Sequence, residues 1–274
     1  MLRLLKPPPL TYSRAHRTWE DACRNAGSYA DPSLFEEERN AVRAVRDGRA
    51  AYALFGVPQT RLAFRWPLLA CLVSIAGWRR AFSGRPLHIL DFGGGLGSVY
   101  DQHRRFLDTI PQLSWSVVDQ PHFVRCGAAE FAGDRLAFFE TVEAASARGE
   151  IDAAIFVGSL GYLEDPYAVL SAMISLDIPY LVLIASQLTN APDDVIRVQR
   201  MGPPYVIAKC RSAFCHDRSC APSWTGGAMR CSPILARATC FEDDPARRRP
   251  RTPRLALSSR RKATLPPPAL WASR

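Results

Sequence analysis

Residues 87–185 alternate short apolar runs with longer segments that mix apolar and polar positions. The apolar runs predict five strands, at residues 87–91, 113–118, 136–139, 151–157 and 180–185. The segments between them predict helices at about residues 98–108 and 123–131 and another beginning at Asp165-Pro166, where the acid suits an N-cap and the proline the first helical position. Strands that alternate with helices favour a parallel, doubly wound sheet. We therefore expect an α/β, Rossmann-like domain over residues 87–209.

The segment before this domain, residues 1–86, reads as helical. Helices are predicted to begin after Thr18, to run from Pro32 or Ser33 to Arg46, and to span Trp66–Phe82. The second of these carries acids and arginines spaced three and four residues apart, a pattern that we interpret as a solvated face: Glu36, Glu37, Glu38, Arg39, Arg43 and Arg46. We expect this segment to cap the cofactor cleft or to shape the substrate side.

Residues 210–274 differ from everything before them. No alternating or helical apolar pattern continues beyond Lys209, and Arg, Pro, Ser and Cys dominate. We predict an irregular, disordered tail, with the C-terminal strands of the sheet missing and the strand at 180–185 left with an unpaired edge. One hypothesis is a shift of the reading frame near residue 209. The alternative is a basic arm for nucleic acid or other anionic partners.

Charge and cysteine content follow the same division. Residues 210–274 hold 13 basic and 4 acidic side chains, so the formal net charge of +9 belongs to that stretch, and we do not expect the folded body to bind nucleic acid. The tail's cysteines lack the paired C-x2-C spacing of zinc sites, so we predict neither a metal site nor a disulfide framework: Cys210, Cys215, Cys220, Cys231 and Cys240.

Targeting signals are not evident in the sequence. No uncharged apolar run reaches the roughly 18–20 residues of a membrane helix, and the prolines at positions 7–9 interrupt the apolar start of the chain. We therefore expect a cytoplasmic protein without a membrane span. The oligomeric state is left open.

The most informative stretch joins the first predicted strand to the helix after it. Asp91 closes the strand, and glycines follow at positions 93, 94, 95 and 97. Glycine permits positive φ and lets a ligand approach the backbone closely, and the start of the next helix suits an anion. A dinucleotide fingerprint requires a third glycine where Ser98 stands. The acid followed by Gly93, Gly95 and Gly97 is instead typical of S-adenosylmethionine (SAM) methyltransferases, although an ordinary glycine-rich turn is an alternative.

The ends of the later strands supply the other candidate cofactor residues. Asp119 closes the second strand, where a carboxylate can accept hydrogen bonds from ribose hydroxyls, although it could equally be a helix cap. After the third strand, Glu140 or Thr141 could contact the adenine or face solvent. Gln120, next to Asp119, belongs to the same predicted cofactor set. After the fourth strand, Ser159 and Leu160 would line the face of methyl transfer.

No general base can be identified from the sequence. SAM carries an activated methyl group, so an enzyme has mainly to align the acceptor and to remove a proton where the acceptor has one. His122 and Tyr162 are candidate bases, and either could simply pack.

Several stretches resemble one bacterial family of class I SAM-dependent methyltransferases. They are residues 90–98 (LDFGGGLGS), 115–121 (WSVVDQP), 123–127 (FVRCG) and 158–167 (GSLGYLEDPY), with Trp19-Glu-Asp-Ala22 and Gly27-Ser-Tyr29 near the start. The resemblance covers about residues 18–209. It implies SAM as cofactor and a link to surface-polysaccharide gene clusters, and it leaves the methyl acceptor open. It also implies a seven-stranded sheet, from which this sequence departs after Lys209. The acid–glycine motif together with Asp119 favours a methyltransferase of a small-molecule or glycan acceptor.

Two other functions remain open at this point. A NAD-dependent oxidoreductase or epimerase is disfavoured by Ser98 at the third-glycine position and by the lack of a Tyr-x-x-x-Lys pair. A non-catalytic remnant of the same fold is favoured by the unusual C-terminal stretch.

Overall fold

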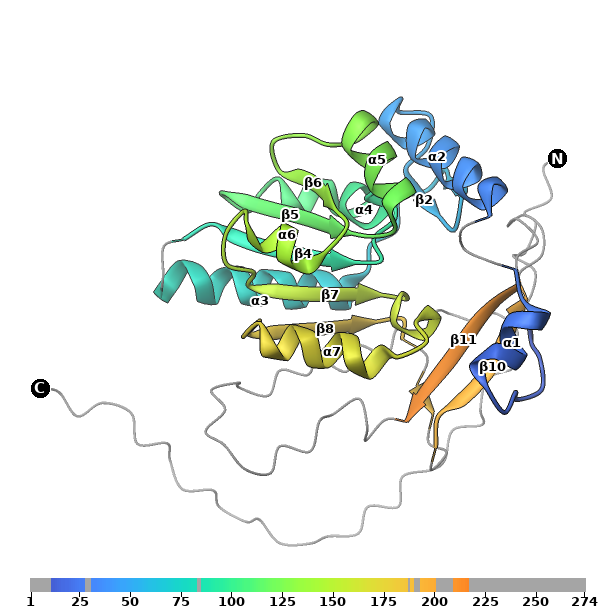
Figure 1. Cartoon of the computed structure of the whole chain (residues 1–274). Helices are drawn as coiled ribbons and strands as arrows, with labels where there is room; N and C mark the ends of the chain where they lie inside the picture. Colours follow the sequence, from blue (N-terminus) through green and yellow to red (C-terminus); the bar gives the residue numbers. More distant parts are fainter. Residues whose placement is uncertain are drawn as a thin grey trace, which may run out of the picture. The chain divides into compact units, whose positions relative to one another are not determined.

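The computed structural model describes residues 11–27, 31–82, 85–186, 188–189, 193–200 and 209–216 (Figure 1). Its centre is a five-stranded sheet in the order β6-β5-β4-β7-β8. Every neighbouring pair in this sheet is parallel. The strands are β4 (Leu87–Phe92), β5 (Leu113–Val118), β6 (Leu136–Phe139), β7 (Ala153–Val157) and β8 (Tyr180–Ile184). The prediction of an α/β fold with these five strands is confirmed.

Helices connect the strands; those after β4, β5 and β7 lie at the predicted places, whereas the short helix between β6 and β7 was not predicted. They are α4 (Ser98–Leu107), α5 (Pro121–Glu130), α6 (Val142–Ser146) and α7 (Pro166–Ser175), with a 3-10 turn, η1 (Leu160–Tyr162), before the last. Strand β4 lies at the centre of this order. From β4 the chain adds β5 and β6 toward one edge of the sheet, and it then adds β7 and β8 on the other side of β4. In such open sheets, ligands bind beyond the carboxyl ends of the strands at this switch point.

Both faces of the sheet are buried, because alternate residues of each strand enter different apolar clusters. Ile89 of β4 and Ile155 of β7 pack in one cluster, and Leu90 and Phe156 in the other. Helix α3 (Trp66–Phe82) and α4 contribute to the first cluster, while α6 and α7 contribute to the second. The apolar runs of the sequence therefore correspond to strands that are covered on both sides.

The N-terminal segment contains the helices that the sequence predicts. Helix α1 (Trp19–Asn25) begins where the Thr18 hydroxyl accepts a hydrogen bond from the N–H of Asp21, and α2 (Pro32–Arg46) begins at the Asp31 cap. A short hairpin that the sequence analysis did not predict, β2 (Tyr52–Leu54) with β3 (Val57–Gln59), lies between α2 and α3. Its turn has positive φ at Phe55 and Gly56. Strands of three residues are too short to give a recognisable alternation.

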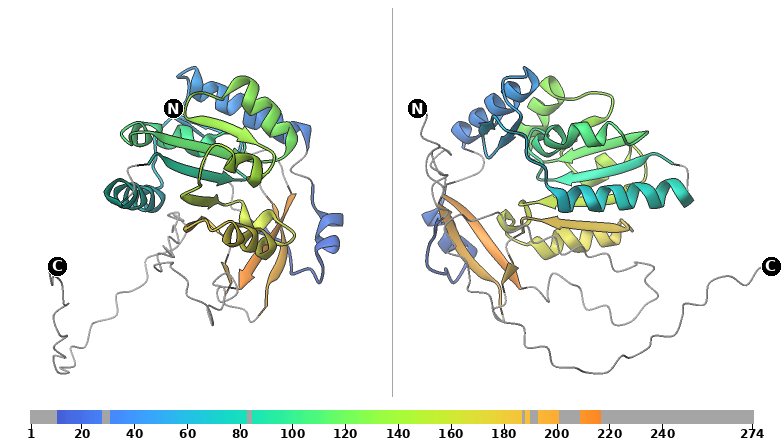
Figure 2. Two further views of the ribbon diagram at one scale, coloured as in Figure 1. Left: turned by 60° about the vertical axis from the view of Figure 1, so that its left-hand side comes forward. Right: turned by 180° about the vertical axis from the view of Figure 1, so that it is seen from behind.

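A second sheet has the strand order β1-β10-β11-β9. Its strands are β1 (Thr11–Tyr12), β9 (Leu188–Thr189), β10 (Val195–Arg200) and β11 (Lys209–His216). Strands β10 and β11 are antiparallel, from Val195 opposite Phe214 to Arg200 opposite Lys209. Figure 2 shows this pair next to α1.

The prediction of an irregular tail from residue 210 onward is wrong for residues 210–216, which belong to strand β11. An antiparallel ladder pairs backbone N–H and C=O groups whatever the side chains are. A strand without apolar alternation can therefore form, although hydrophobic periodicity does not predict it. Among the described strands, β8 is paired only with β7, as predicted for the edge of the main sheet. The rest of the predicted tail, including Cys220, Cys231 and Cys240, lies outside the described residues, and the frame-shift hypothesis stays a hypothesis.

The described residues contain neither a membrane-spanning helix nor a cluster of metal ligands. None of their helices combines the length and hydrophobicity that a membrane crossing requires. Nor do they contain a group of three or more His, Cys, Asp or Glu side chains placed to hold a metal ion.

Candidate functional site

The glycine loop follows β4 directly and turns into α4. Three of its glycines have positive φ: 71° at Gly93, 58° at Gly95 and 85° at Gly97, the N-cap of α4. Gly93 is also restricted by packing, since a Cβ there would lie 2.5 Å from Cβ of Ser159. Ser159 donates a 2.6 Å hydrogen bond to the carbonyl of Phe92, which joins the end of β7 to the end of β4. The loop therefore needs its glycines for both conformation and close contact.

Asp91 lies beneath this loop and is only 1% exposed. Its Oδ2 accepts a 3.2 Å hydrogen bond from the indole N–H of Trp115, whereas Oδ1 is buried without a partner among the described residues. A Cβ at Gly94 would lie 2.6 Å from the Asp91 carboxyl group. Burial raises the pKa of Asp91 to about 7; the hydrogen bond from Trp115 acts against this shift and the charge of Asp119 adds to it.

Asp119 meets the loop from the end of β5. The N–H of Gly95 donates to its Oδ2 at 2.8 Å, and the N–H of Gln120 donates to its Oδ1 at 2.7 Å. Burial raises the pKa of Asp119, although both backbone hydrogen bonds and the charge of His122 favour the ionised form. The structure thus brings together the glycine loop and the acid that the sequence paired with it.

A third carboxyl group, that of Glu38 on α2, also reaches the loop. Its Oε2 accepts a 2.7 Å hydrogen bond from the N–H of Gly56, and its Oε1 accepts one from the hydroxyl of Ser98. A Cβ at Gly95 would lie 4.0 Å from Oε1. Burial raises the pKa of Glu38, and the charge of Asp119 contributes to the rise.

The interpretation of residues 36–38 as a solvated face was therefore wrong for Glu38. A signal was present in the sequence: Glu38 lies three, four and seven residues before Ala41, Val42 and Val45, which pack in the apolar core. An acid on the apolar stripe of a helix faces the protein, where it needs polar partners.

The remaining predicted cofactor residues have different surroundings. Gln120 and Glu140 are exposed. The Thr141 hydroxyl accepts a 3.1 Å hydrogen bond from the N–H of Ala144 and so caps α6. Leu160 is 1% exposed and its side chain packs in the second apolar cluster. A ligand at this position would therefore contact the backbone of Leu160.

The two candidate bases have different surroundings. The His122 ring packs edge-on against Phe35 at 5.3 Å and lies 4.6 Å from the ring of Phe123, and its Nε2 is buried without a partner among the described residues. The Tyr162 hydroxyl donates a 2.9 Å hydrogen bond to Oε1 of Gln199 on β10, a side chain that is 2% exposed. The charge of His122 acts on Asp119, while Tyr162 connects the segment after β7 to the second sheet.

No protein-family model matches the chain, and no curated protein matches its sequence. The solved structures that it resembles include the plantazolicin methyltransferase BpumL in complex with SAH, at 17% identity and a TM-score of 0.32 over 56% of this chain and 51% of that one. They also include 1,6-didemethyltoxoflavin-N1-methyltransferase of Burkholderia thailandensis with bound 1,6-didemethyltoxoflavin and S-adenosylhomocysteine, at 15% identity and a TM-score of 0.35, covering 78% of this chain and 83% of that one.

A third is the SAM-bound amino pentose methyltransferase CalS10 of Micromonospora echinaspora, at 16% identity and a TM-score of 0.29 over 48% of this chain and 62% of that one. The match to BpumL spans about half the length of that protein. Similarity at this level does not transfer a function, so the residues of the site itself have to indicate one.

Proposed function

We propose that this chain is a methyltransferase that uses SAM and acts on a small-molecule or glycan acceptor. The observation that carries the proposal is the convergence of three carboxyl groups on one glycine loop. Asp91 lies against Gly94, Asp119 accepts a hydrogen bond from the N–H of Gly95, and Oε1 of Glu38 lies 4.0 Å from where a Cβ of Gly95 would be. Such a loop suits a ligand that brings hydroxyl and cationic groups.

The same observation argues against a dinucleotide cofactor. A Rossmann dinucleotide places its pyrophosphate on the glycine turn and the helix start behind it. Here Ser98, the first residue of that helix, donates its hydroxyl to Glu38, so a carboxylate already faces the place where the phosphates would lie. Like charges in a partly buried site repel strongly. SAM has no phosphate, and its ammonium and sulfonium groups are positive.

Each predicted residue then has a distinct role. Asp119 accepts hydrogen bonds from the ribose hydroxyls, and the unpartnered Oδ1 of Asp91 is an acceptor beneath the loop. Gln120, Glu140 and Thr141 border the adenine. Ser159 and the backbone of Leu160 border the face of methyl transfer.

The cofactor supplies an activated methyl group, so the chain has to hold the acceptor in line and to take up a proton where one is released. His122 is the stronger candidate base, because its buried Nε2 lacks a partner among the described residues. The hydroxyl of Tyr162 already donates to Gln199. The resemblance to a family linked to surface polysaccharides makes sugar acceptors the first class to assay.

The decisive test is calorimetric titration of the full chain with S-adenosylhomocysteine, with NAD⁺ in a parallel titration. Micromolar binding of the first ligand alone is the expected result. Binding of NAD⁺ alone would replace the proposal with an oxidoreductase or epimerase. Binding of S-adenosylhomocysteine without methyl transfer to any acceptor of a sugar and small-molecule panel would favour the non-catalytic remnant.

A further inference from the structure

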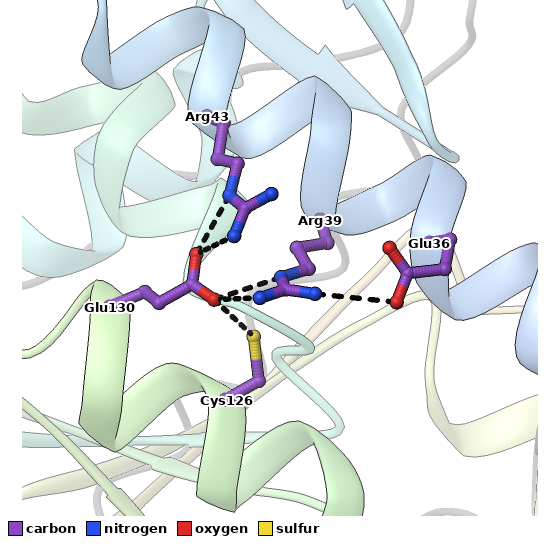
Figure 3. Close-up of polar contacts among 5 residues, drawn as sticks. All are labelled: Glu36, Arg39, Arg43, Cys126 and Glu130. Atoms are coloured by element: carbon purple, nitrogen blue, oxygen red, sulfur yellow. Dashed lines mark hydrogen bonds and ion pairs between the residues drawn. The ribbon is translucent and has the colours of Figure 1, made fainter.

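Helix α2 is attached to the two helices that follow the cofactor strands. Arg39 and Arg43 both bind the carboxylate of Glu130 at the end of α5; Nε of Arg39 lies 2.8 Å from Oε1, and Nε of Arg43 lies 2.7 Å from Oε2 (Figure 3). Arg46 binds Asp101 of α4 at 2.8 Å. Helices α4 and α5 begin directly after the loops that contain Gly95 and Asp119, so α2 is fixed relative to both halves of the site.

Glu38 lies on the face of α2 that is turned toward the loop. It links three segments that are remote in the sequence: α2 itself, the β2–β3 turn through the N–H of Gly56, and the start of α4 through the hydroxyl of Ser98. Figure 3 shows Arg39 and Arg43 directed instead toward Glu130 of α5, with Glu36 directed toward Arg39. The same helix thus presents an ion-pair face to α5 and a carboxyl group to the loop.

From this arrangement we propose that Glu38 is a positioning residue of the cofactor site, which makes the N-terminal segment part of that site. The inference rests on the proposed function and deepens it. Two carboxyl groups act on the loop at Gly95. Asp119 accepts a hydrogen bond from the N–H of Gly95, and Glu38 accepts one from the hydroxyl of Ser98, three residues later. When a ribose binds, its hydroxyls compete with the N–H of Gly95 for the carboxylate of Asp119. Glu38 then holds the loop, through Ser98, in the conformation in which the loop backbone faces the ligand.

The charges near Glu38 come from several elements. Asp119 at the end of β5 acts on Glu38 directly and also acts on Asp91 of β4, and the charge of His122 of α5 acts on Asp119. A cationic ligand favours the ionised form of these carboxyl groups, so its binding should release protons. Removing Glu38 should change the number released.

The test compares Glu38→Gln with Glu37→Gln, a control at the neighbouring exposed position of the same helix. The full chain is titrated with SAM, which its sulfonium makes cationic, in two buffers of different ionisation enthalpy, which gives both the Kd and the number of protons released. Glu38→Gln should weaken binding by about tenfold or more and reduce the protons released. Glu37→Gln should leave both quantities as in the wild type.

Ser98→Ala provides a second route, because it removes the same hydrogen bond without altering a charge. It should also weaken binding, and the double variant should bind no worse than Glu38→Gln, because the two residues act through one contact. Wild-type Kd and proton release in a folded Glu38→Gln protein would overturn the inference, as would additive effects of the two substitutions. If Glu38→Gln does not fold, a wild-type Kd for Ser98→Ala overturns it. Failure of the wild type itself to bind would instead contradict the proposed function.

Discussion

The backbone N–H of Gly95 donates a 2.8 Å hydrogen bond to Oδ2 of Asp119, although 24 residues separate the two. This bond joins the loop after the central strand β4 to the end of the neighbouring strand β5. The parallel pairing of these strands, with Asp91 opposite Val117, brings the two ends together. The glycine loop and the second acid therefore form one site, which the following predictions address.

Replacement of Gly95 should separate ligand binding from folding. Gly95→Ala places a Cβ at φ 58°, which costs about 1–2 kcal/mol, in a space whose nearest atom is 4.0 Å away. Gly95→Arg adds a long side chain over the loop and should abolish binding of S-adenosylhomocysteine at a similar cost in stability. Gly133→Ala, in open space without positive φ, is the control for both thermal unfolding and calorimetry. Tight binding by Gly95→Arg would contradict the placement of the ligand.

Removal of the Asp119 carboxylate should weaken the binding of both SAM and S-adenosylhomocysteine. Hydrogen bonds to charged groups contribute about 1.5–3 kcal/mol, so Asp119→Ala should raise the Kd by about 10- to 100-fold. Asp119→Asn retains one acceptor oxygen and should have a smaller effect. Asp134→Asn, at an exposed position, should bind like the wild type. Equal affinities for Asp119→Ala and the control would mean that this acid is only a helix-start residue.

The affinity for SAM should rise with pH up to about neutrality. Burial raises the pKa of Asp91 to about 7, so this group is protonated below that pH in the free protein. A cationic ligand prefers the ionised carboxylate, and its binding must displace the proton; the affinity therefore increases as the pH rises toward 7 and levels off above it. Calorimetry from about pH 5.5 to about pH 8.5 should show this slope in the wild type and a flatter profile in Asp91→Asn. A slope of opposite sign would show that the site binds a ligand group of negative charge.

Tyr162→Phe should lower stability and leave cofactor binding intact. The Tyr162 hydroxyl donates to Gln199, which is 2% exposed, so its loss should cost about 1–3 kcal/mol. Tyr167→Phe is a matched control, because the hydroxyl of Tyr167 donates to the exposed Asp194 and should matter less. Thermal unfolding and the Kd of S-adenosylhomocysteine distinguish the outcomes. Loss of methyl transfer with unchanged stability would instead identify Tyr162 as the base.

Local patterns were sufficient for the main sheet and for the chemical type of the loop. Mostly apolar runs such as 87–91 and 151–157 predict buried strands, and β4 and β7 are buried on both faces. The positive φ values of Gly93, Gly95 and Gly97 follow from a turn that only glycine adopts without strain. The N-caps Thr18 and Asp165 were predicted because capping depends on residues three positions apart.

What the tertiary structure decided depends on contacts between distant segments. The sequence predicts Glu38 to be one of three solvated acids, and only the packing of α2 against the β2–β3 hairpin and the apolar core turns it toward Ser98 and Gly56. Strand β11 forms because β10 supplies its backbone partners, a fact that the side chains of residues 209–216 do not encode. The sequence by itself therefore determined the alternating sheet and its glycine loop, since short-range periodicity and glycine conformation specify both. The third carboxyl group at the loop and the second sheet were decided by the tertiary structure, because long-range hydrogen bonds create them.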